Sequence, residues 1–159
     1  MSDDAAKREW VVRVLKVSFP TQPRTGSLSL VKLAKSRFAW RSERMSAVAE
    51  IGRLKMAISE RFKDDETQAS ALTAALGRLD TLIGSFGPAL DDSLDEVLNG
   101  DETKRPTSIA AARTQMARFQ TIIEGDEIMS ELDGNEVLPD MVVTAPLLRA
   151  LGAIDAALG

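Results

Sequence analysis

Cysteine, histidine and tyrosine are all absent from this sequence of 159 residues. Without cysteine the chain forms no disulfide, no thiolate zinc site and no cysteine nucleophile, which suits a reducing compartment. Without histidine it lacks the commonest general base, the commonest metal ligand and every histidine-dependent catalytic triad. Only carboxylates, lysine and arginine remain as titratable side chains. We therefore expect a protein that is not an enzyme and that uses no cofactor or metal.

Long apolar runs are missing too, because no stretch approaches the roughly 20 apolar residues that a membrane-spanning helix needs. The N-terminal sequence MSDDAAKREW opens with acidic side chains and lacks the basic-then-apolar order of a signal peptide. We expect a cytoplasmic, soluble protein that does not bind membranes. Secretion by a route without a signal peptide stays open as an alternative.

Charge is distributed unevenly along the chain, although the net charge is only −4. Residues 1–63 hold 14 basic and six acidic side chains, whereas residues 64–102 hold one basic and ten acidic side chains. If both parts fold into one body, they can neutralise each other. If they do not, the molecule has one basic and one acidic face.

Proline and glycine divide the chain into two parts. The stretch PTQPRTGS has two prolines, one glycine and no apolar periodicity, so we place a boundary there. Residues 1–26 form an N-terminal segment and linker, and residues 27–159 form one domain. Within residues 4–19 the acidic start favours a helix and the many valines favour a strand, and helix is weakly preferred.

The domain is predicted to be helical throughout. Residues 29–63 contain no proline and a single glycine, and their apolar side chains recur at helical spacing, which predicts one long helix. A second helix runs to Ile83, where GSFGP interrupts it, and a third starts at Pro88. Two further helices start at Pro106 and at Thr144, which we expect to cap its helix. The short connections predict an all-α, up-and-down bundle of about five helices.

The most unusual part of the long helix is the stretch LAKSRFAWRSERMS, which surrounds Trp40 with the arginines Arg37, Arg41 and Arg44. On a helical projection these arginines lie between two apolar stripes, one containing Trp40 and the other containing Phe38. We expect each stripe to face a different neighbouring helix, with the arginines in the seam between them. Their predicted partners are downstream carboxylates: Asp80, Asp91, Asp92, Asp95 and Glu96.

Two alternatives use the same charged residues differently. An open groove could use Arg37, Arg41 and Arg44 to bind an anion or a nucleic acid, although aromatic residues make up only 4% of the chain. A metal protein or a carboxylate enzyme could be built on the acidic residues: Asp91, Asp92, Asp95 and Glu96. Within the first alternative a nucleic acid is less favoured than another anion, because the acidic residues 64–102 follow directly. The metal protein or enzyme is the second alternative.

A resemblance to a known class of segment rests on three stretches, KSRFAWRSERMSAVAEIGRLKMAISERFKDD, LDDSLDEVLNGDE and DEIMSELDGNEVLP. Their order resembles a helical accessory segment that recurs in large, multidomain bacterial proteins, some of them toxin-like or secretion-associated. The resemblance covers residues 28–159 and implies a bacterial source and an accessory or interaction role. It transfers no functional residue.

Taken together, these features predict a non-enzymatic module that binds a protein partner or a neighbouring domain. Homo-oligomers are possible. The expected contact residues are Arg37, Trp40, Arg41 and Arg44, together with the N-terminal apolar residues Trp10 and Phe19.

Overall fold

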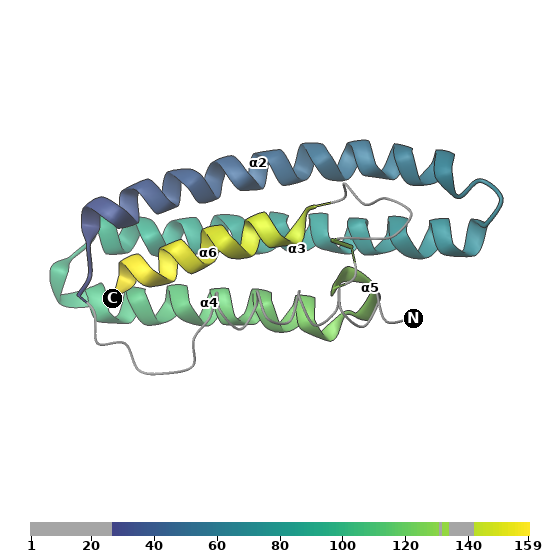
Figure 1. Ribbon diagram of the computed structural model, residues 1–159. Helices are drawn as coiled ribbons and strands as arrows, with labels where there is room; N and C mark the ends of the chain where they lie inside the picture. Colours follow the sequence, from purple (N-terminus) through teal and green to yellow (C-terminus); the bar gives the residue numbers. More distant parts are fainter. Residues whose placement is uncertain (1–26, 131, 134–141) are drawn as a thin grey trace.

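The structure, a computed structural model, describes residues 27–130, 132–133 and 142–159 (Figure 1). The predicted N-terminal segment, its preference for helix and its boundary at residues 20–26 lie outside the described residues. The described part contains five α-helices, one short 3₁₀ helix and no strand. The predicted all-α fold is therefore confirmed.

Three long helices and the shorter α6 run side by side in an up-and-down order (Figure 1). The elements are α2 (Leu30–Arg61), α3 (Glu66–Asn99), η1 (Glu102–Lys104), α4 (Arg105–Gly125), α5 (Glu127–Ser130) and α6 (Thr144–Leu158). The short α6 lies against α2 and α4 and covers only the part of the bundle where α2 begins (Figure 1). At that end the backbone N–H of Ser29 donates to the carbonyl oxygen of Ala157 at 3.0 Å.

α2 is the one long helix that the sequence predicts over residues 29–63. Its 32 residues span about 48 Å at 1.5 Å per residue. Ser29 is the N-cap, and its hydroxyl accepts a hydrogen bond from the N–H of Lys32 at 3.3 Å. One face is buried in the bundle: Leu33, Trp40, Ala47, Ile51, Leu54 and Ile58.

α3 runs without interruption through GSFGP, so the predicted break before Pro88 is wrong. An interior proline removes one helical hydrogen bond and crowds the preceding turn, at a cost of about 3 kcal/mol. The core face continues in register across it, with Ile83 before the proline and Leu90 after it, both buried. Burial along this face keeps the chain helical where local preference alone predicts a turn.

The start of α6 also differs from the prediction, because Thr144 does not cap it. Asp133 does so from the preceding turn. Its Oδ1 accepts from the N–H groups of Val143 and Thr144 at 2.9 Å, and its Oδ2 accepts from the N–H of Ala145 at 2.8 Å. Asp133 is only 2% exposed, and the Thr144 hydroxyl has no hydrogen-bond partner among the described residues.

Three aromatic rings from three helices meet in the core. Trp40 of α2 lies edge-on to Phe86 of α3 and to Phe119 of α4, with ring centroids 5.8 and 6.2 Å away. Phe86 and Phe119 are 4.5 Å apart. Edge-to-face packing of this kind adds about 1 kcal/mol per pair to the burial of the rings. The cluster fixes which face of α2 points inward.

Candidate functional site

The predicted seam of arginines exists between α2 and α3. Both Arg37 and Arg41 bind the carboxylate of Asp91 with two hydrogen bonds each, at 2.9 and 3.1 Å for Arg37 and at 2.9 and 2.7 Å for Arg41. Arg37 also donates to Asp95 at 3.3 Å. Within the described residues, the other predicted partners form no ion pair: Asp80, Asp92 and Glu96.

This geometry holds the carboxylate of Asp91 in its charged form. Hydrogen bonds from Arg41 and Arg37 lower the pKa of Asp91 far below its usual range, against the opposing effect of partial burial. The bond to Asp91 in turn raises the pKa of Arg41. The side chains of Arg37 and Asp91 are only 14% and 18% exposed, so their attraction is weakly screened by solvent. Arg37 and Arg41 are thus engaged within the chain and stabilise the α2–α3 pair.

Arg44 behaves differently from the other two arginines. Its guanidinium lies 5.6 Å from the centre of the Trp40 ring, which is a cation–π distance. Its Nε is buried and has no hydrogen-bond partner among the described residues. Burial lowers the pKa of Arg44, and the charge of Asp91 only partly opposes that. Arg44 therefore packs against α3 through its methylene groups and its flat guanidinium, and no carboxylate of the described residues forms an ion pair with it.

Glycine at position 87 makes room for Arg44. A methyl group there would lie 2.9 Å from Cδ and 3.0 Å from Cζ of Arg44, and it would overlap Nη1. The helix break predicted at GSFGP is wrong, and the pattern of that stretch does not indicate this role for Gly87. The signal in the sequence is a glycine on the core face of a strongly amphipathic helix.

Gly87→Ala is expected to destabilise the chain by about 1–2 kcal/mol, because the clash with Arg44 outweighs the helix preference of alanine. Gly84→Ala is the matched control, since a methyl group there meets nothing within 4 Å; this change should be neutral or stabilising. Urea unfolding of both variants checks the prediction. Equal effects at the two positions would show that Arg44 moves aside freely.

Trp40 was predicted as a contact residue, and the structure corrects this. Its side chain is 0% exposed and belongs to the aromatic core, so it is not available to a partner. Trp10 and Phe19, the two N-terminal contact residues predicted, lie outside the described residues. Aromatic character alone did not distinguish a core position from a surface position.

The second apolar stripe of α2 was expected to face a neighbouring helix, and this is wrong for the described part of the chain. Phe38 and Met45 are both 75% exposed. The described residues include eight large apolar side chains that are exposed, and six of these belong to α2. We call the exposed face of α2 the outward stripe: Val31, Ala34, Phe38, Met45, Val48, Ala49, Gly52 and Met56.

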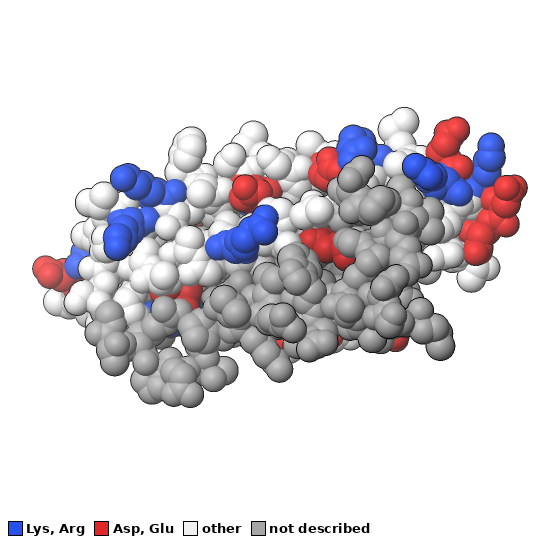
Figure 2. All heavy atoms as spheres, in the orientation of Figure 1, with Lys and Arg blue, Asp and Glu red and all other residues white. Residues whose placement is uncertain are grey.

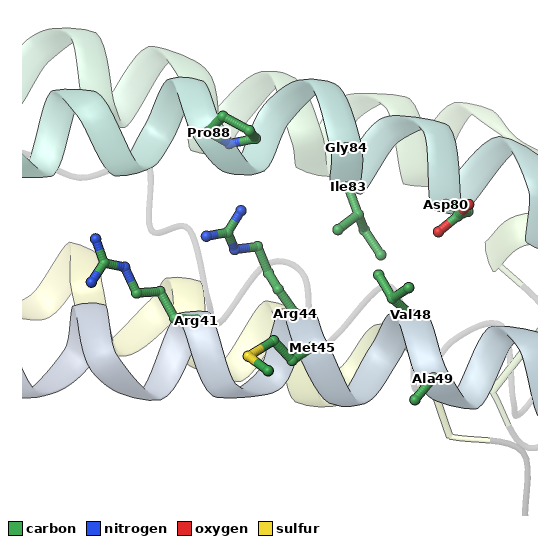
Figure 3. A pocket seen from close by; sticks show the side chains of 9 residues that line it. All are labelled: Arg41, Arg44, Met45, Val48, Ala49, Asp80, Ile83, Gly84 and Pro88. Atoms are coloured by element: carbon green, nitrogen blue, oxygen red, sulfur yellow. The ribbon is translucent and has the colours of Figure 1, made fainter.

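Beside the outward stripe runs a groove between α2 and α3, with a volume of about 750 Å³ (Figure 3). Val48 of α2 faces Ile83 of α3 across it, and Arg44 reaches from α2 toward Pro88 (Figure 3). Arg41 and Asp80 lie at its two ends (Figure 3). In the view of Figure 2 basic and acidic side chains lie together at the right end, where the turn joins α2 to α3, and much of the upper edge, formed by α2, is uncharged.

The carboxylates of α3 do not assemble a metal centre. Asp91 and Asp95 share the seam arginines, and no group of three acidic side chains suited to a metal ion occurs among the described residues.

No described helix combines the length and the apolar content needed to cross a membrane. Comparisons with protein-family models, with curated proteins and with solved structures each gave no match. The function is therefore inferred from the exposed side chains of α2.

Proposed function

We propose that this chain is a non-enzymatic protein–protein interaction module whose contact surface is the outward stripe of α2 with the adjoining groove. The observation that carries the proposal is the concentration of six of the eight exposed large apolar side chains on this one helix. Proteins seldom leave a contiguous apolar surface to water unless it is covered by a partner. The accessory role in a bacterial protein, which the resemblance implies, is part of the same proposal.

The charges support a protein partner over an anion. Arg37 and Arg41 already bind Asp91, and an anion would have to compete with a carboxylate that makes four hydrogen bonds. Arg44 packs against Trp40 and Gly87. The outward stripe itself offers methyl, thioether and aromatic groups, which suit the apolar side of another helix.

Affinity capture from a lysate of the source cell tests the proposal when the wild type is compared with two single substitutions on α2. Met45→Glu places a charge in the centre of the outward stripe, whereas Ala39→Glu adds the same charge at an exposed position on another side of α2. We expect at least one protein, further copies of this chain included, to be retained by the wild type and by Ala39→Glu but lost with Met45→Glu. Identical sets of retained proteins for all three chains would contradict the proposal.

A further inference from the structure

The outward stripe has a regular spacing along α2. Val31, Phe38, Met45 and Gly52 follow one another at intervals of seven residues. Ala34, Arg41 and Val48 stand between them, and all seven positions are exposed. Arg41 is the one charged residue among the seven, and the other six are apolar side chains or glycine. Apolar residues at alternating intervals of three and four are the pattern by which one helix packs lengthwise on another. The stripe is thus shaped for a helix lying along α2.

The polar residues beside the stripe have a fixed order along the same axis. Contacts between α2 and α3 bring Lys55 level with Gly77 and Arg44 level with Gly87. Since α3 runs antiparallel to α2, Asp80 lies level with about residue 51 of α2. The groove therefore has a cation, Arg41, toward the start of α2 and a carboxylate, Asp80, toward its end (Figure 3).

We propose that the occupant of the outward stripe is a second copy of this chain, with the two α2 helices antiparallel around a two-fold axis at the turn Met45–Val48. This rests on the proposed function and names its partner. In this register Met45 packs beside Val48 of the second copy, and the long side chain of Arg41 lies over Gly52 of the second copy. Phe38 meets the stem of Lys55 and the thioether of Met56.

The same register matches the charges. Gly52 and Asp80 lie at nearly the same level along the bundle. Arg41 of one copy keeps its hydrogen bonds to Asp91 through Nε and Nη2, and its half-exposed guanidinium presents Nη1 to Asp80 of the other copy. The symmetry repeats the contact. The bulky Arg41 and the small Gly52 stand at equal distances on opposite sides of the axis, and so, nearly, do the cation of Arg41 and the carboxylate of Asp80. A surface with that property is complementary to itself, which favours a second copy over an unrelated partner.

A parallel pair lacks this complementarity. It would place Arg41 against Arg41 of the second copy, so that neither exposed Nη1 would meet a carboxylate of the other copy. It would also place Gly52 against Gly52 and leave a gap in the contact. The antiparallel arrangement is the one that the order of residues along α2 supports.

Single cysteines test the arrangement directly, because the chain has none of its own. In the full chain, Met45→Cys puts two thiols next to the axis, where a short bismaleimide reagent can join them. Ser59→Cys, at another exposed position on the same side of α2, puts the thiols about 38 Å apart. We expect most Met45→Cys chains to shift from 17.2 kDa to twice that mass, and Ser59→Cys chains to stay at 17.2 kDa.

Equal crosslinking of both variants would overturn the antiparallel arrangement in favour of a parallel one. Crosslinking of neither variant would overturn the second copy as the occupant. In that case the capture experiment with Met45→Glu still decides the proposed function, because a different protein lost only with that variant would leave the interaction surface standing. The two failures are therefore distinguishable.

Discussion

Asp133→Ala is expected to destabilise the chain by about 3 kcal/mol, which is a melting temperature lower by roughly 10 °C for a chain of this size. The Asp133 carboxylate accepts three backbone hydrogen bonds from residues 143–145 and is almost fully buried. Alanine leaves these N–H groups at the start of α6 without an acceptor in a site that water does not reach. Loss of this cap weakens the packing of α6 on α2.

Thermal unfolding followed by circular dichroism measures the effect, with Thr144→Val as the matched control. The Thr144 hydroxyl is buried and accepts or donates no hydrogen bond within the described part of the chain. Its removal should therefore change the free energy of unfolding by less than about 1 kcal/mol. If Thr144→Val proved as harmful as Asp133→Ala, the helix would be capped by its own first residue, as local sequence rules suggest.

Asp91→Asn is the second large effect that we expect, a loss of about 2 kcal/mol at neutral pH. The substitution keeps the shape of the side chain but removes the charge that holds Arg37 and Arg41. Two guanidinium groups then stand close together, with only the more exposed carboxylate of Asp95 beside Arg37 as a counter-charge. Urea unfolding gives the difference, and Asp92→Asn is the control, because Asp92 is exposed and forms no ion pair among the described residues.

The pH dependence of Asp91→Asn separates charge from shape. The pKa of Asp91 is lowered in the folded chain, so its contribution is fully present above the unfolded value of about 4 and is lost as the pH falls below it. The wild type and Asp91→Asn should differ most at neutral pH and become similar as the solution is made strongly acidic. A difference that stays constant with pH would mean that the carboxylate contributes packing and not charge.

Much of the fold follows from local patterns in the sequence. The span of α2 and the limits of α4, with Pro106 at its start and Gly125 at its end, were predictable from periodicity and from proline and glycine. The continuous α3 was not, because the cost of Pro88 is local whereas the burial of Ile83 and Leu90 depends on the other helices. The Asp133 cap was missed for a similar reason: its hydrogen bonds cross ten or more residues of the chain.

The seam was predictable in part. Helical geometry placed Arg37 and Arg41 between two apolar stripes. The charge pattern indicated carboxylates among the acidic residues 64–102 as their partners. Helical geometry could not tell which stripe is buried, since Trp40 and Phe38 are both aromatic and the number of neighbouring helices is set by the whole fold. The role of Gly87 depends on the Arg44 side chain, which lies against position 87 of α3 in the folded chain.

We propose that α2 stabilises the bundle with one face and binds a second copy of the chain with the other. The melting temperature as a function of protein concentration tests it most directly, with the wild type and Met45→Glu measured side by side. The wild-type melting temperature should rise with concentration and approach that of Met45→Glu on dilution, because only the associated form gains stability by mass action. A wild-type melting temperature that does not change with concentration, or a Met45→Glu chain that melts far lower at every concentration, would contradict it.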